Sequence, residues 1–182
     1  IDVSDLARRF DVPVLAHAIT AAELDPGLVT GRLDDGDVVR SGELELRAIF
    51  TPGHAAGHLA FLVGDDCLTA DVLFRGTVGG TRGPGGSYPD LRHSVMERLL
   101  TLPPHTRVHP GHREATTVAA EWETNPFVRV WRGLDPEGDV ACLVRGEPAT
   151  LLLWADDYDG GHKALVRFAG GEDAIVGGSQ VT

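Results

Sequence analysis

Apolar residues recur at a helical spacing in one long segment of the chain, residues 89–102. Leu91, Val95, Leu99 and Leu102 lie at positions i, i+4, i+8 and i+11, which share one face of a helix. Two prolines follow this segment, and proline does not continue a helix. The pattern therefore predicts an amphipathic helix over 89–102 with one apolar face.

Three shorter helices are predicted from residues that cap helix ends. Side chains of Ser and Thr accept hydrogen bonds from the free N–H groups of a first helical turn, and the residue before a proline disfavours the helical conformation. The expected segments are residues 5–10 after Ser4, one turn that begins at Thr20, and a helix from Thr116 or Thr117 to Glu123 that Asn125-Pro126 ends.

Short apolar runs between Gly, Pro and Asp residues predict β-strands. The run at 13–16 is expected to be buried, and a Gly-Asp-Asp turn joins 59–63 to 67–70 in a predicted hairpin. In the first part of the chain, the expected strands are residues 13–16, 37–40, 43–50, 59–63, 67–70 and 106–108.

From about Val140 the pattern contains strands and no helix. Gly-rich and Asp-rich breaks separate four short runs, which predicts an antiparallel meander, either a compact barrel or a β-extension packed on the main domain. The runs are residues 141–145, 149–155, 162–168 and 174–176. We therefore expect an α/β chain with a main domain at 1–139 and a small β-rich extension at 140–182.

Composition narrows the classes of partner. The chain has 182 residues, of which 42% are hydrophobic and 24% charged, with a formal net charge of −11. This charge argues against a nucleic-acid or anionic-membrane surface, because both attract Lys and Arg. No stretch approaches the ~20 apolar residues of a membrane span.

The two cysteines indicate the compartment. Cys67 and Cys142 both lie among apolar or β-favouring neighbours, as small buried residues in a reducing compartment do. We therefore expect a cytoplasmic protein, with a disulfide as the open alternative. The first residue is Ile1 and not Met, which indicates a piece of a longer chain or a lost start.

Candidate metal-binding residues lie where predicted strands end. His54 and His58 lie in one Pro-Gly loop, His109 and His112 in another, and Asp71 directly follows the 67–70 strand. Strand ends hold side chains on a rigid edge, and loop glycines let the backbone bend so that they converge. Imidazole nitrogens with a carboxylate are a ligand set that Zn²⁺ prefers. The alternative is that Asp71 caps a turn and the histidines bond to backbone carbonyls.

The other four histidines have no partner at ligand spacing. A histidine of this kind is typically a solvated or a core residue. They are His17, His93, His105 and His162.

Three ordered motifs resemble the metallo-β-lactamase superfamily, and more narrowly its glyoxalase II-like branch. They are Thr-Pro-Gly-His-Ala-Ala-Gly-His at 51–58, Thr-Ala-Asp-Val-Leu-Phe-Arg-Gly-Thr-Val-Gly at 69–79, and His-Pro-Gly-His at 109–112. The similarity runs from about Val12 to Phe127 and includes Glu121, Asn125 and Pro126. The resemblance implies a partial αββα sandwich.

The resemblance also implies residue roles. His54 matches the ligand that completes the first metal's set, Asp71 the carboxylate that bridges both metals, and His112 the ligand that completes the second set. His58 matches a position that is usually structural, and His109 one that often holds tyrosine or another residue. We therefore expect two divalent metal ions, zinc first and iron or manganese as alternatives.

The chain departs from the family pattern at three points. Family members carry a His-x-His-x-Asp-His cluster upstream, and this sequence contains none, so we expect the lost segment directly before Ile1. Gly80 stands where many relatives have arginine. The helical C-terminal domain that binds glutathione in glyoxalase II is replaced by the β-rich tail.

The resemblance implies hydrolysis of a thioester by a metal-bound hydroxide, as in a hydroxyacylglutathione hydrolase, with S-lactoylglutathione or a related small acyl-thiol as the type substrate. Arg75 and Arg82 flank the glycine-rich loop and are candidates to meet a substrate carboxylate, or are simply solvated. Three alternatives stay open: a single-iron persulfide dioxygenase, a lactone or β-lactam hydrolase, and a non-catalytic fragment or binding module whose incomplete sandwich exposes apolar strand faces. The pattern leaves the oligomeric state open.

Overall fold

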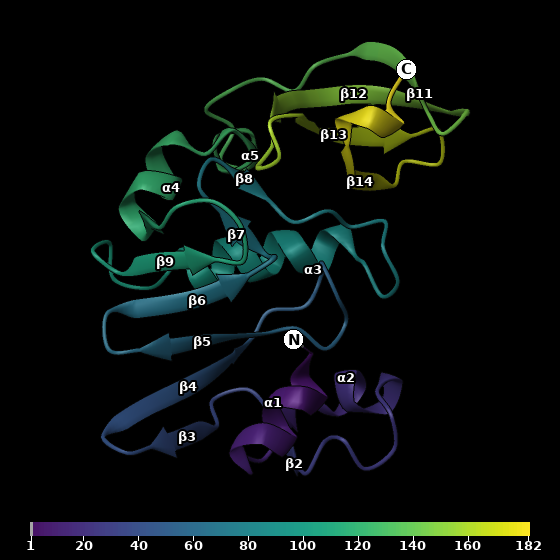
Figure 1. The fold of residues 1–182 in the computed structure, drawn as a ribbon. Helices are drawn as coiled ribbons and strands as arrows, with labels where there is room; N and C mark the ends of the chain where they lie inside the picture. The colour runs from purple at the N-terminus through teal and green to yellow at the C-terminus, as the bar shows by residue number, and fades with distance from the viewer. Residues whose placement is uncertain (1) are drawn as a thin grey trace.

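The computed structural model describes residues 2–182, which form a mixed α/β fold with two main sheets (Figure 1). The α/β class expected from the sequence is confirmed. The helices are α1 (Val3–Phe10), α2 (Ala18–Glu23), α3 (Tyr88–His93), the π-helical turn η1 (Ser94–Leu99), α4 (Val118–Thr124), α5 (Pro126–Trp131) and the short 3₁₀ turn η2 (Gly178–Gln180). No helix in this range is long and apolar enough to cross a membrane.

The larger sheet has the strand order β10-β9-β6-β5-β4-β3. Its strands are β3 (Val38–Ser41), β4 (Leu44–Phe50), β5 (Leu59–Val63), β6 (Asp66–Ala70), β9 (Arg107–Pro110) and β10 (Thr116–Thr117). The predicted hairpin of β5 and β6 is confirmed. β6 and β9 pair in parallel with Ala70 opposite Pro110, so the residues that follow both strands lie at one edge of the sheet.

The predicted amphipathic helix exists, but its second half differs. Ser87 caps α3, which continues into η1, and the helical segment ends at Leu99. Leu91, Val95 and Leu99 are buried in the main core, as their spacing predicts. Leu102 lies beyond the helix and packs against the same core.

The N-terminal segment differs most from expectation. Asp2 caps α1, because its carboxylate accepts from Asp5 N at 2.9 Å, while Ser4 only donates to that carboxylate. α1 has no buried residue, so its apolar face stays exposed. The predicted buried strand at 13–16 shrinks to the half-buried β1 (Leu15–Ala16), paired in parallel with β2 (Gly31–Arg32).

Two further helix starts were wrong or missed. His17, not Thr20, caps α2, and the Thr20 hydroxyl donates to Gly57 O instead. Asn125 ends α4 as expected, but it also caps α5 by accepting from the N–H groups of Phe127 and Val128. Pro126 stands at the first position of that helix, where its missing N–H costs nothing.

The predicted C-terminal meander is a four-stranded antiparallel sheet in the order β11-β12-β13-β14. The strands are β11 (Val140–Val144), β12 (Glu147–Asp156), β13 (His162–Phe168) and β14 (Asp173–Gly177). One face adds Leu152, Leu165 and Ile175 to the main core, while the other forms a small cluster of its own with Val166 and Phe168. The main core thus has members on both sides of the expected boundary at 139/140, and that boundary stays a prediction.

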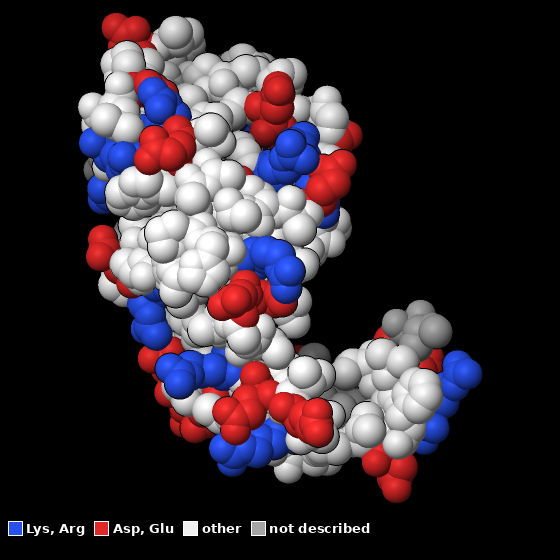
Figure 2. All heavy atoms as spheres, turned by 90° about the vertical axis from the view of Figure 1, so that its left-hand side faces the viewer, with Lys and Arg blue, Asp and Glu red and all other residues white. Residues whose placement is uncertain are grey.

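Figure 2 shows acidic and basic side chains interspersed over one side of the molecule, with a projecting lobe at the bottom. Figure 1 places the N-terminal helices α1 and α2 at the bottom of the fold. The absence of buried residues in both helices agrees with this projection.

Candidate metal centre

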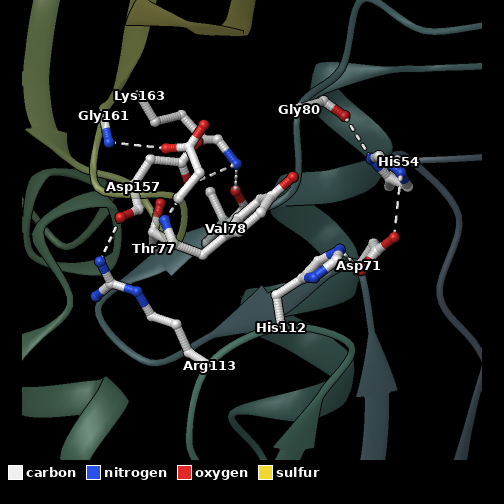
Figure 3. Close-up of polar contacts among 12 residues, drawn as sticks. His54, Asp71, Thr77, Val78, Gly80, His112, Arg113, Asp157, Gly161 and Lys163 are labelled. Carbon is white, nitrogen blue, oxygen red and sulfur yellow. Dashed lines mark hydrogen bonds and ion pairs between the residues drawn. The ribbon is translucent and has the colours of Figure 1, made fainter.

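Three loops bring His54, Asp71 and His112 together (Figure 3). His54 lies between β4 and β5, while Asp71 and His112 follow the parallel pair β6 and β9. His54 Nε2 lies 4.0 Å from Asp71 Oδ2, and His112 Nε2 lies 3.7 Å from Asp71 Oδ1. Each carboxylate oxygen therefore faces one imidazole.

A hydrogen bond fixes the tautomer of His54. Its Nδ1 lies 2.9 Å from Gly80 O, and a carbonyl oxygen only accepts, so Nδ1–H donates. In the neutral ring Nε2 then carries the lone pair, and it is Nε2 that faces Asp71. A backbone carbonyl on the far nitrogen is the usual way in which a metal-ligating histidine is oriented.

Two glycines leave room for the Asp71 side chain and backbone. A Cβ on Gly111 would lie 2.5 Å from Asp71 Oδ1, and a Cβ on Gly79 would lie 2.2 Å from Asp71 O and 3.2 Å from His54 Cβ. A larger residue at position 79 would meet backbone, and one at position 111 would force the end of the Asp71 side chain to move. The glycines of two separate motifs are therefore needed to seat the same aspartate.

The donor set fits divalent metal ions, although no complete set is present. The side chains of His54, Asp71 and His112 are 38%, 40% and 48% exposed, so an ion can reach them. Nitrogen and carboxylate oxygen donors suit zinc, and a carboxylate with two free oxygens can bridge two ions. Within residues 2–182, no three His, Cys, Asp or Glu side chains come close enough to hold one ion between them.

His58 points away from this group. Its Nδ1 lies 2.8 Å from Thr51 Oγ1, and its Nε2 is buried without a hydrogen-bond partner among the described residues. Burial, followed by the charge of the nearby His54, lowers the pKa of His58 to about 4. A neutral, partly buried imidazole at this position braces the loop.

His109 engages a different carboxylate from its neighbour His112. Its Nε2 lies 2.6 Å from Asp66 Oδ1, and Arg107 donates to both oxygens of Asp66. Hydrogen bonds from Arg107 and His109 hold the pKa of Asp66 well below its usual range. His109 is therefore part of an ion-pair cluster at the sheet edge and does not face Asp71.

Three of the histidines that the sequence analysis set aside have contacts away from this group. His17 stacks on Phe50, His105 lies 3.3 Å from Asp65, and His162 stacks on Trp154. Neither cysteine forms a disulfide; burial raises the pKa of the Cys67 thiol to about 12.

The two candidate arginines differ in their surroundings. Arg82 packs against the C-terminal sheet, where it lies over the Phe168 ring and near Glu147 and Glu172. Arg75 lies 3.6 Å from Glu114, and it lines an open hollow of about 650 Å³ together with Arg107 and Arg113. Arg113 directly follows His112 in the chain, but His54, Asp71 and His112 are not among the residues that line this hollow.

Sequence reasoning missed Tyr158 and Lys163, which the C-terminal sheet adds to the site. The Tyr158 ring stacks on His112, with the centroids 4.3 Å apart and the planes at 6°. The Lys163 ammonium is buried against Val78 O and Asp157. One signal was available: a lysine among apolar residues of a short strand has to find a buried partner.

No protein-family model matches the chain. Among curated proteins, it is 35% identical over 144 residues to "Probable metallo-hydrolase YqgX" of Bacillus subtilis, covering 69% of this chain and 68% of that protein. It is 40% identical over 120 residues to ML0493 of Mycobacterium leprae, covering 64% and 55%. "Probable polyketide biosynthesis zinc-dependent hydrolase BaeB" of Bacillus velezensis is 39% identical over 80 residues, covering 44% and 36%. The chain thus spans from about a third to two thirds of these relatives.

Solved structures share the fold. The BLEG-1 B3 metallo-β-lactamase has a TM-score of 0.64 at 27% identity, with 69% of each chain covered. ETHE1 from Myxococcus xanthus has a TM-score of 0.62 at 28% identity, covering 72% of this chain and 62% of that one. TTHA1623 in a di-iron-bound form has a TM-score of 0.58 at 36% identity, with 69% of each chain covered.

Proposed function

We propose, on the premise that this chain belongs to the metallo-β-lactamase superfamily of metal-dependent hydrolases, that its site hydrolyses thioesters of small acyl-thiols. Membership rests on the Bacillus subtilis metallo-hydrolase, 35% identical over 68% of its length, and on the shared fold. The observation that carries the hydrolytic proposal is Asp71, which presents one oxygen to each of two imidazoles.

The proposal assigns His54 and Asp71 to one divalent ion and His112 and Asp71 to a second. A zinc-dependent relative and a di-iron neighbour support these two metals as candidates, with manganese as a third. Metal ions held here would lower the pKa of a water molecule and polarise a substrate carbonyl. The whole protein's activity is part of the proposal, because the chain spans only part of its relatives.

The chain's own residues support a water nucleophile over a covalent one. Burial raises the pKa of Cys67 to about 12, so its thiolate is not available at neutral pH. Gly80 O holds the His54 ring with Nε2 free, and Gly111 leaves the carboxylate of Asp71 unobstructed. These residues orient metal ligands and make no bond to an acyl group.

Arg75 supports a substrate with an acidic group. Its pair with Glu114 is long, at 3.6 Å, and both side chains are more than half exposed, so the pair contributes little and leaves the guanidinium accessible. It lines the 650 Å³ hollow, to which Arg113, the residue after His112, also contributes. A carboxylate on the thiol or acyl part of the substrate fits this position.

A persulfide dioxygenase is the second candidate. The likeness to ETHE1 from Myxococcus xanthus supports it, at 28% identity over 72% of this chain. A site with two histidines, one carboxylate and open positions suits a single Fe²⁺, whereas within residues 2–182 no three such side chains close around one ion. In that reading, one iron replaces the two-metal arrangement and the substrate is a persulfide.

A non-catalytic module is the third candidate, since one face of the large sheet carries exposed leucines. Leu44 and Leu68 are 58% and 44% exposed, on the face opposite Ile49 and Cys67. Such a face favours contact with another protein surface.

Metal analysis combined with two assays distinguishes the three candidate functions. The protein is purified without added chelator, its metal content is measured, and release of free thiol from a thioester is compared with oxygen uptake on a persulfide. We expect two ions per chain and thiol release. One bound iron with oxygen uptake would contradict the thioesterase proposal and support the dioxygenase. Absence of both bound metal and both activities would support the binding module.

A further inference from the structure

His54 and His112 are oriented by different means. His54 donates from Nδ1 to Gly80 O, whereas the His112 ring has no hydrogen bond within residues 2–182. Its edge faces Asp71 at 3.7 Å, and its face lies on Tyr158 with nearly parallel planes. A flat stack opposes rotation of the imidazole about its bond to Cβ. Stacking on Tyr158 therefore restrains the orientation of His112, as the hydrogen bond to Gly80 O restrains that of His54.

A buried ion pair anchors the turn that carries Tyr158. Tyr158 N donates to Asp157 Oδ1 at 2.8 Å, and the same oxygen lies 3.1 Å from Lys163 Nζ. The side chains of Asp157 and Lys163 are 8% and 6% exposed (Figure 3). Arg113 also donates to Asp157 O, which ties the turn to the residue after His112.

The same part of the tail also holds the segment that orients His54. Lys163 Nζ donates to Val78 O at 2.9 Å. Beyond Gly80, Thr81 N donates to Ile175 O and Ile175 N donates to Thr81 Oγ1, both at 2.9 Å. Residues of β13 and β14 thus fix the backbone on both sides of Gly80 and, through it, the ring of His54.

We propose that the turn between β12 and β13 is a positioning element of the metal centre, in which Tyr158 orients the imidazole of His112 by stacking on it. The inference rests on the proposed function, because it takes His112 as a metal ligand. Tyr158 is a positioning residue and touches neither metal nor reacting atoms. The β-rich tail therefore belongs to the site and is more than an appendage.

A Co²⁺ titration followed by its absorption spectrum tests this inference on the wild-type protein and four variants, of which His112→Ala identifies the ion that His112 binds. Tyr158→Leu removes the ring, and we expect the ion lost in His112→Ala to bind about 10- to 100-fold more weakly, the range typical when a ligand's supporting residue is removed. Tyr158→Phe keeps the ring and should retain the wild-type affinity. Trp154→Leu is the matched control, since it removes an equivalent stack from His162, which is not a proposed ligand.

The Co²⁺ affinities of these proteins separate failure of the inference from failure of the proposed function. Unchanged Co²⁺ affinity in Tyr158→Leu overturns the inference and leaves the proposed function standing, whereas a wild-type protein that binds no Co²⁺ overturns both. Equal weakening in Tyr158→Phe assigns the effect to the hydroxyl and contradicts the stacking role. If Tyr158→Leu fails to fold, NMR on the metal-free wild type decides: upfield ring-current shifts of the His112 ring protons are expected, and their absence refutes the stack.

Discussion

His58 is a partly buried imidazole in the same loop as His54, and the burial of its ring links the stability of the fold to pH. Its pKa is lowered from 6.5 to about 4, so the folded chain holds it neutral where the unfolded chain would protonate it. A group of this kind contributes stability above pH 6.5 and loses it as the pH falls towards 4. The shift corresponds to about 3 kcal/mol at most.

We predict that the free energy of unfolding falls between pH 6.5 and pH 4 and that His58→Asn reduces this fall. Asparagine keeps an amide near Thr51 but does not titrate in this range. Urea unfolding at pH 7.5, 5.5 and 4.5 measures both proteins. Identical pH profiles for the two would show that His58 is not the titrating group.

The histidines show what the sequence could and could not predict at this scale. The Pro-Gly loops at strand ends singled out His54, His58, His109 and His112, but local sequence does not say which ring faces which carboxylate. The backbone decides it: His109 faces Asp66 across the sheet, and His112 lies beyond the strand end, beside Asp71. Tyr158 could not be predicted, because its contact with His112 depends on how the second sheet packs.

Among the secondary-structure elements, the parallel pair of β6 and β9 positions the site. Ala70 lies opposite Pro110, which brings Gly111 against the carboxylate of Asp71. The clash expected from a Cβ on Gly111 falls on the end of a side chain, whereas the clash from Gly79 falls on backbone. Substitution of Gly111 and substitution of Gly79 should therefore have different effects.

We predict that Gly111→Ala folds but weakens metal binding, because Asp71 has to move its carboxylate. Gly79→Ala should destabilise the fold by about 1–3 kcal/mol, the usual cost of overpacking. Thermal unfolding and metal titration measure the two effects. Gly83→Ala is the matched control, with open space around its Cβ and an ordinary backbone conformation, and it should change neither. Wild-type metal binding in Gly111→Ala would argue against the placement of Asp71.

The elements themselves were largely predictable where glycine and proline mark their ends. All four strands of the C-terminal sheet and the hairpin of β5 and β6 were expected within a few residues. One error arose because one residue can serve two elements: Asn125 both ends α4 and caps α5. Another arose at the N-terminus, where Asp2 and Ser4 both have side chains that can cap a helix and Asp2 takes that role.

On the scale of the whole molecule, the lysine of a buried ion pair joins the C-terminal sheet to the two-stranded hairpin that follows Asp71. Lys163 lies on β13 and donates to Val78 O of β8 (Thr77–Val78), while Asp157 neutralises its charge. Removing one partner of a buried pair leaves the other charge uncompensated, at a typical cost of about 3–5 kcal/mol.

We predict that Lys163→Met lowers the free energy of unfolding by about this amount and that Asp157→Asn added to Lys163→Met recovers part of it, because no buried charge is then left alone. Urea unfolding of the two variants and wild type measures the difference. A double variant no more stable than Lys163→Met would show that the loss comes from packing and not from the unpaired carboxylate.

The bridging role of Asp71 is the central claim, and metal stoichiometry tests it most directly. Bound metal is counted in wild type, His54→Ala, His112→Ala and Asp71→Ala after equilibration with Zn²⁺ at neutral pH. We predict two ions in wild type, loss of one in each histidine variant, and loss of both in Asp71→Ala. Wild-type metal content in Asp71→Ala, or loss of the same single ion in all three variants, would contradict a carboxylate shared between two metal sites.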